Sequence, residues 1–113
     1  MQKIEAKGTN GQLTVDGNLI HITRKGFVAF ANHGFDGTKT IFISKLSGTQ
    51  FKECGKLTSG YIQFVFSGSE ESKKGLFNAT SDENTVMFDT QNEENFIKIR
   101  DYIFHSFNNM EVL

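Results

Sequence analysis

The hydrophobic pattern of the chain changes its period once, close to Thr90. Before that residue, apolar side chains alternate with polar ones in short runs, which is the period of half-buried strands. After it, apolar residues recur at the spacings of an amphipathic helix, and these are Phe96, Ile97, Ile99, Ile103, Phe104 and Phe107. Strands followed by one terminal helix predict an α+β fold, mainly β, in which the helix covers apolar surface that the strands leave open.

The clearest strand signal is a hairpin over Gln12–Thr23. Two alternating runs flank Asp16-Gly17, a dipeptide that accepts the positive φ angles of a type I′ turn. With these two residues as the loop, Leu13 pairs with Ile20. This register places Leu13, Ile20 and Ile22 on one face of the hairpin, directed toward a core.

Further segments alternate in the same way and are bounded by turn residues. A turn around Ser47-Gly48 is expected to separate two of them, and another at Ser81–Asn84 to separate the last two. The predicted strands outside the hairpin are Lys3–Lys7, Thr38–Ser44, Thr49–Glu53, Gly60–Ser67, Leu76–Thr80 and Thr85–Asp89.

The terminal helix is predicted over about residues 91–107. Thr90 and Glu93 have the spacing of a capping box, in which each side chain bonds to a backbone N–H group of the other residue. Asn108-Asn109 is a natural stop, which leaves residues 108–113 as a short tail. This helix would be about 25 Å long.

Length and composition describe one globular domain over residues 1–113. The chain is 37% hydrophobic and 22% charged, and it has no proline. Its net charge of -1 gives no general attraction to nucleic acids or to anionic membranes, so neither is expected as a partner. The first ten residues lack the apolar run of a secretory signal, and the single cysteine, Cys54, fits a reducing compartment. We therefore expect a cytoplasmic protein.

No pattern of a catalytic, metal or cofactor site is found in the sequence. The histidines His21, His33 and His105 lack zinc-site spacing, and the glycines form neither a phosphate-binding loop nor a nucleophile elbow. His33 and Asp36 share a glycine-flanked loop and are a candidate acid–base pair, with turn formation as the simpler interpretation. We expect no enzyme, no metal and no cofactor.

Five segments together have the pattern of a known family: GTNGQLTVDGNLIHITRKG, KTIFISKLSG, GYIQFVF, ENTVMF and NFIKIRDYIF. In these the chain resembles a bacterial family of unknown function that is built on a pleckstrin-homology-like (PH-like) barrel and is often joined to a SHOCT oligomerisation module. The resemblance implies a bent antiparallel sheet or small barrel of six to seven strands, capped by one C-terminal helix. Lipid-binding members of the wider superfamily carry lysine and arginine at the first hairpin, whereas the tip here, Asp16–Asn18, is acidic.

The segment Gly26–Gly37 is unusually apolar for a connection. Phe27, Phe30 and Phe35 either close the barrel as part of its core or stay accessible and anchor a protein partner. The leading interpretation is a non-catalytic module that recognises a protein or peptide, or a second copy of itself, through an exposed sheet edge or a groove beside the helix. The alternatives are a lipid-headgroup module at a membrane surface and, less favoured, a small hydrolase.

Overall fold

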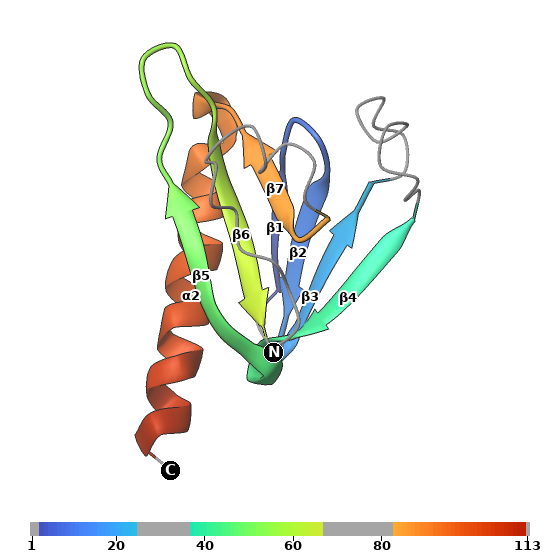
Figure 1. Cartoon of the computed structure of the whole chain (residues 1–113), viewed down its shortest axis with the longest axis vertical. Coiled ribbons are helices and arrows are strands. Elements are labelled where there is room, and N and C mark those ends of the chain that lie inside the picture. Colours follow the sequence, from blue (N-terminus) through green and yellow to red (C-terminus); the bar gives the residue numbers. More distant parts are fainter. Residues whose placement is uncertain (1–2, 25–36, 67–82, 113) are drawn as a thin grey trace.

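Within the residues that the computed structural model describes, 3–24, 37–66 and 83–112, seven strands form two antiparallel sheets and one long helix follows them (Figure 1). The first sheet has the order β1-β2-β3-β4 and the second β5-β6-β7. The α+β class, mainly β with a C-terminal helix, is confirmed. The strands are β1 (Lys3–Lys7), β2 (Gln12–Asp16), β3 (Leu19–Thr23), β4 (Thr38–Phe42), β5 (Leu46–Lys52), β6 (Gly60–Phe66) and β7 (Thr85–Phe88).

β2 and β3 form the predicted hairpin, but the predicted register is wrong. Leu13 pairs with Ile22 instead of Ile20, so the two-residue loop is Gly17-Asn18 instead of Asp16-Gly17. Gly17 has φ 60° and the following residue does not have a positive φ, which is the pattern of a type II′ turn. Glycine decides the register, because it adopts this φ at the first loop position without strain.

The chain passes from the first sheet to the second through the 3₁₀ turn η2 (Ile43–Lys45), and not at Ser47-Gly48 as predicted. Ile43 is buried, and its N–H donates to the carbonyl oxygen of Asn18 at 2.8 Å, so the chain turns while this side chain stays in the core. Ser47-Gly48 lies inside β5, where the pairing with β6 shifts register. Glycine here marks a strand irregularity and not a strand end.

The helix α2 (Glu93–Val112) begins two residues later and ends five residues later than predicted, after the 3₁₀ turn η3 (Thr90–Asn92). Glu93 does not serve the predicted capping box, because its carboxylate accepts a hydrogen bond from the backbone N–H of Cys54 at 2.7 Å. Asn108-Asn109 does not stop the helix. Asparagine costs less than about 1 kcal/mol inside a helix, and no glycine or proline follows it to break the helix.

The core lies between the two sheets, and α2 completes it. α2 packs against β1 and β6, so it bridges both sheets. Phe96 stacks on Phe88 of β7 with their ring centroids 4.4 Å apart. Phe104, predicted to share the buried face of the helix, is instead 61% exposed. The core residues include Leu13, Val15, Ile20, Ile22, Ile62, Phe64, Val86, Phe88, Phe96, Ile99 and Ile103.

Candidate functional site

The candidate residues predicted from the segment Gly26–Gly37 lie almost wholly outside the described residues. This applies to Phe27, Phe30 and Phe35 and to the pair His33 and Asp36, and also to the predicted strand at residues 76–80. Their roles stay predictions. The site is therefore built from the described strands and α2.

The other two histidines lie apart and do not form a shared site. His21, on β3, has its Nδ1 2.9 Å from Oγ1 of Thr40 on the neighbouring strand. His105 is exposed on α2 and stands edge-on to the ring of Phe104, with their centroids 6.3 Å apart. Over residues 3–24, 37–66 and 83–112, no three histidine, cysteine or carboxylate side chains gather in a way that could hold a metal ion. In the same ranges no helix has the length and apolar character needed to cross a membrane.

The β7 edge of the second sheet is closed by the connection between β1 and β2. The N–H of Thr9 donates to the carbonyl oxygen of Met87 at 2.8 Å, and the N–H of Met87 donates to Oδ1 of Asn10 at 2.9 Å. Gly8 lies so close that a Cβ atom there would be 2.3 Å from the Met87 oxygen. A side chain at this position would require the β1–β2 connection or β7 to shift.

Arg24 completes this closure from inside the protein. Only 1% of its surface is exposed. Its Nη2 donates to the carbonyl oxygens of Glu83 at 2.7 Å and Thr85 at 2.8 Å, and its Nη1 donates to that of Asn10 at 3.2 Å. A buried guanidinium that joins three chain segments is structural, so it is not accessible to a lipid phosphate.

Sequence reasoning missed the burial of Arg24, although the signal was present. Ile20 and Ile22 are the inward-facing residues of β3, and Arg24 follows them in the same alternating phase. An arginine in the inward phase of a strand is buried unless the chain turns first.

The β5 edge is different, because outward-facing backbone groups remain there. The N–H of Phe64 donates to the carbonyl oxygen of Asn84, just before β7, at 3.0 Å. Because backbone groups point alternately to the two sides of a strand, the N–H and C=O groups of Gln63 face β5. The residue paired with Gln63 on β5 is Gln50. Thr49 and Phe51, which flank Gln50, therefore direct their N–H and C=O groups to the outer edge. Neither makes a hydrogen bond outside the β5–β6 ladder among the described residues.

A groove of about 640 Å³ lies between this edge and α2, and we call it the β5–α2 groove. In Figure 1, β5 is the outermost strand of its sheet on the side along which α2 runs. Phe104, on the helix side of the groove, is largely exposed. The groove is lined by Ser47, Gly48, Thr49, Phe51, Arg100, Asp101, Ile103, Phe104 and Phe107.

Both walls of the groove are held in place. The Arg100 guanidinium lies 4.8 Å from the centroid of the Phe51 ring and also donates to Oδ1 of Asp101 at 3.1 Å. The hydroxyl of Tyr102 donates to the carbonyl oxygen of Gly17 at 2.8 Å, which ties the helix to the β2–β3 hairpin. A groove with fixed walls loses little conformational freedom when an extended segment binds in it.

The start of α2 is fixed to the chain just after β5. Besides its bond to Glu93, Cys54 directs its Sγ to the carbonyl oxygen of Phe88 at 3.4 Å. Burial raises the pKa of the Cys54 thiol above its ordinary value of 9.0, and the nearby Glu93 carboxylate adds to the rise. This thiol is a packing and hydrogen-bonding group and not an activated nucleophile.

Comparison with known proteins places the chain in one family. A family model described as Domain of unknown function (DUF4429) matches residues 13–103. This span runs from β2 into α2 and includes the β5 wall of the groove, while Phe104 and Phe107 follow its end. No curated protein and no solved structure matches the chain. The protein therefore belongs to the family described as a domain of unknown function, DUF4429.

Proposed function

We propose that this protein is a non-catalytic binding module that takes an extended segment of another protein as an added strand along β5, in the β5–α2 groove. The observation that carries the proposal is the outward-facing backbone of Thr49 and Phe51 beside an exposed Phe104. An open strand edge supplies main-chain hydrogen bonds, and neighbouring pockets select alternate side chains of the guest.

The side chains of the groove indicate which segments it favours. Side chains of an added strand point alternately to its two faces, and we expect one face to meet α2. There the groove offers Phe104 and Phe107, whereas Ile103 is buried in the core. Arg100 and Asp101 pair with each other and so add little net charge. We expect a segment with an apolar residue at every second position and no requirement for charge.

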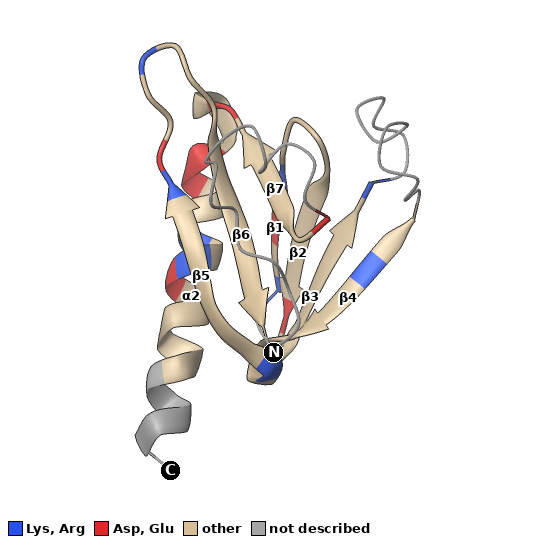
Figure 2. Ribbon diagram, viewed as in Figure 1, with Lys and Arg blue, Asp and Glu red and all other residues tan. Residues whose placement is uncertain are grey.

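The competing lipid-headgroup function has less support. The described basic positions are interspersed with acidic ones in Figure 2. Arg24, which is near the first hairpin in sequence, is buried and bonded to three carbonyl groups. Phosphate recognition depends on accessible lysine or arginine.

We propose further that the domain is PH-like. A four-stranded sheet, a three-stranded sheet and a C-terminal helix form the arrangement that the PH-like resemblance implies, and this supports a PH-like module. We also place the protein in the cytoplasm, which its single thiol supports, because disulfides are rare in that compartment.

The decisive experiment changes one backbone donor. Peptides are selected from a random displayed library on the whole chain, and their affinity is measured by fluorescence anisotropy for Thr49→Pro and Thr49→Val. Proline removes the outward N–H without breaking the β5–β6 ladder, and an edge strand tolerates it. Valine keeps the N–H group. We expect Thr49→Pro to weaken binding about tenfold and Thr49→Val to change it by less than about twofold.

Thermal melts of both variants accompany the binding measurement, so that a folding defect is recognised. Equal affinity for the two variants, at equal melting temperature, would rule out strand addition at β5. If the library yields no peptide that saturates the protein, the binding function itself is wrong. If the chain dimerises and the selected peptide dissociates the dimer, the natural occupant of the groove is a second copy of this protein.

A further inference from the structure

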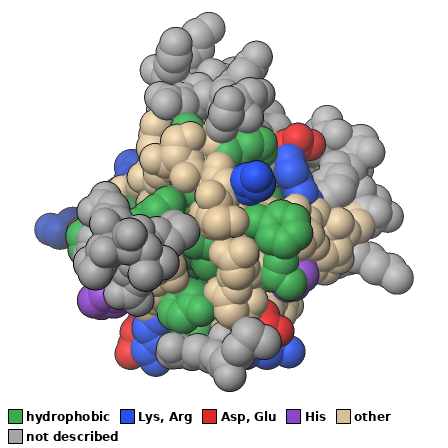
Figure 3. All heavy atoms as spheres, turned by 90° about the horizontal axis from the view of Figure 1, so that it is seen from below, with side chains coloured by type: hydrophobic (Ala, Val, Ile, Leu, Met, Phe, Trp, Pro, Cys, Tyr) green, Lys and Arg blue, Asp and Glu red, His purple; other side chains and the backbone are tan. Residues whose placement is uncertain are grey.

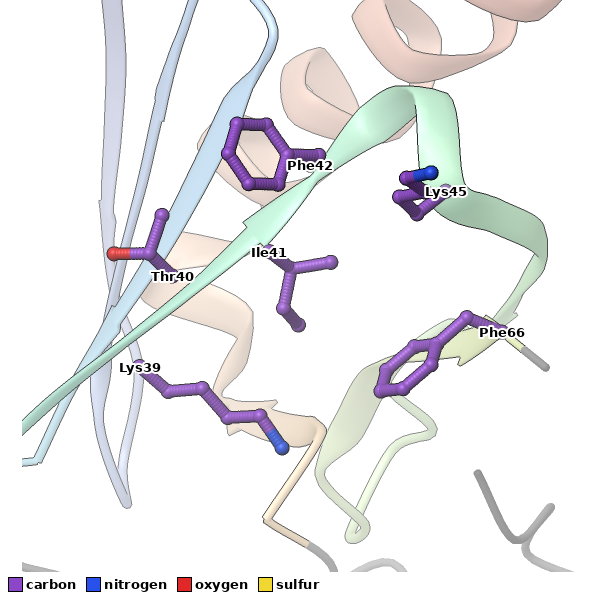
Figure 4. A pocket seen from close by; sticks show the side chains of 6 residues that line it. All are labelled: Lys39, Thr40, Ile41, Phe42, Lys45 and Phe66. Atoms are coloured by element: carbon purple, nitrogen blue, oxygen red, sulfur yellow. The ribbon is translucent and has the colours of Figure 1, made fainter. Parts of the chain in front are cut away.

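A second hollow lies away from the β5–α2 groove, where the two sheets separate. Among the described strands, β4 pairs only with β3, and the chain leaves it through η2, while the β5–β6 pairing ends at Leu46 and Phe66. The space between has a volume of about 350 Å³. It is lined by Lys39, Thr40, Ile41, Phe42, Lys45 and Phe66 (Figure 4).

We infer that this hollow binds a small amphipathic anion, a carboxylate joined to an apolar chain. The inference does not depend on the proposed peptide function, because it rests on other residues. It is carried by an apolar wall and by a lysine, Lys45, that has no ion pair among the described residues.

The apolar wall comes from two sheets. Ile41, on the inward phase of β4, and Phe66, at the end of β6, face each other across the space in Figure 4. Phe42, on the other face of β4, is 51% exposed at the rim. Viewed from the end of the molecule where β4 meets η2, hydrophobic side chains reach the surface beside basic ones (Figure 3). An apolar chain bound here would remove this surface from water.

The charges favour one negative group. Lys39 and Lys45 lie on opposite sides of the hollow in Figure 4. Lys39 is paired with Glu83 at 2.7 Å and stands 5.8 Å from the centroid of the Phe66 ring. Lys45 is exposed and has no ion pair or hydrogen bond from its side chain among the described residues. Among the described residues at the hollow, Lys39, Lys45 and Glu83 sum to one positive charge, and a carboxylate would neutralise it.

The size of the hollow limits the ligand. Sites for small molecules commonly measure about 300–1,000 Å³, so this one is at the small end. A medium-length alkyl chain fits this description better than a two-chain lipid. Decanoate is therefore a suitable probe, with decanol as the uncharged analogue and hexanoate as the shorter one.

The test titrates each probe, below its micelle concentration, into the whole chain, and amide chemical shifts report the site. We expect decanoate to saturate and to shift the amides of Ile41, Lys45 and Phe66. Hexanoate should bind at least about tenfold more weakly, because each buried methylene contributes about fourfold in affinity. Decanol, which lacks the charge, should bind about tenfold more weakly than decanoate.

Matched lysine variants decide whether the charge acts locally. Lys45→Gln should weaken decanoate binding about tenfold and leave decanol binding unchanged. Lys56→Gln changes another exposed lysine, in the β5–β6 loop, and should have no effect. The inference is overturned if both variants weaken binding equally, if decanol binds as tightly as decanoate, or if the shifts never saturate at this site.

Discussion

The two edges of the three-stranded sheet differ in how their outward-facing backbone groups are satisfied. Each edge strand, β5 and β7, has backbone groups that no neighbouring strand of its own sheet can satisfy. At β7 these groups are met by the β1–β2 connection and by Arg24. At β5 the groups of Thr49 and Phe51 have no such partners among the described residues.

This difference indicates that the β7 edge contributes to stability, whereas the β5 edge is a surface for recognition. The β7 edge uses a buried charge, a glycine without space for a side chain and an asparagine bonded to the backbone. Such a closure is costly to break, since removing one member leaves buried groups without partners. The β5 edge is only flanked by α2, at the distance that leaves a groove. Changes at the closed edge should therefore affect folding, and changes at the open edge should affect binding.

The sharpest contrast between the edges is between two arginines. Arg24→Met leaves three carbonyl oxygens without their donor and should lower the free energy of unfolding by about 3–5 kcal/mol. Arg100→Met removes a partly exposed ion pair and a contact with Phe51, and should cost less than about 1 kcal/mol. Urea denaturation of both variants provides the measurement. Equal losses would show that the β5 edge is as tightly closed as the β7 edge.

Two glycines give the same contrast with a smaller effect. A methyl group at Gly8 would meet backbone oxygen atoms at 2.3 and 2.8 Å, so Gly8→Ala should cost about 1–3 kcal/mol of stability. Gly48, in β5, has no atom of the described residues within 4 Å of such a methyl group. Gly48→Ala should be neutral or stabilising by about 0.4–1 kcal/mol. Thermal unfolding distinguishes these cases, and a destabilising Gly48→Ala would mean that β5 is constrained at its bulge.

The sequence predicts the local elements of this fold well, because their signals are periodic. The alternation of apolar and polar residues correctly predicted β1, β6 and β7. The spacing of Phe96, Ile99 and Ile103 correctly predicted the buried face of α2. Two of the errors occurred at glycines, because glycine is used both in turns and in strand irregularities. Gly17 opens a turn, whereas Gly48 sits in a strand irregularity, and composition alone does not separate the two.

The candidate site was far less predictable than the fold. The groove combines β5 with a helix about fifty residues later, and such long-range pairing leaves no trace in a local pattern. One feature of the sequence did indicate the groove. Phe104 widens the apolar stripe of the helix, yet it is exposed and not part of the core. The sequence suggested a groove beside the helix, but not which strand forms its other wall. The hollow beside Lys45 also depends on where two sheets diverge, which no local pattern reports.

The Cys54 thiol provides a pH test at the point where β5 is joined to the start of α2. Its pKa is raised in the folded protein, so the folded state holds the proton more firmly than the unfolded chain. The resulting stability is fully present below about pH 9, near the ordinary thiol pKa, and is lost as the pH rises through the raised value. Cys54→Ala should therefore lose less stability than the wild-type protein between pH 7 and pH 10. Urea titrations at both pH values test this, and an identical loss would show that the thiol titrates alike in both states.

The smallest effect on stability is expected at Phe104, on the helix wall of the open edge. Phe104 is 61% exposed, so Phe104→Ser should change the free energy of unfolding by less than about 0.5 kcal/mol. Phe96→Ala, on the buried face of the same helix, should cost about 3–5 kcal/mol because it leaves a cavity. The serine variant should nevertheless weaken peptide binding about tenfold or more, since an exposed aromatic side chain at a groove acts as an anchor. Melting curves and peptide affinity must be measured on the same samples. A Phe104→Ser protein that loses stability like Phe96→Ala would show that the helix already fills the groove, and the two edges would then be equally closed.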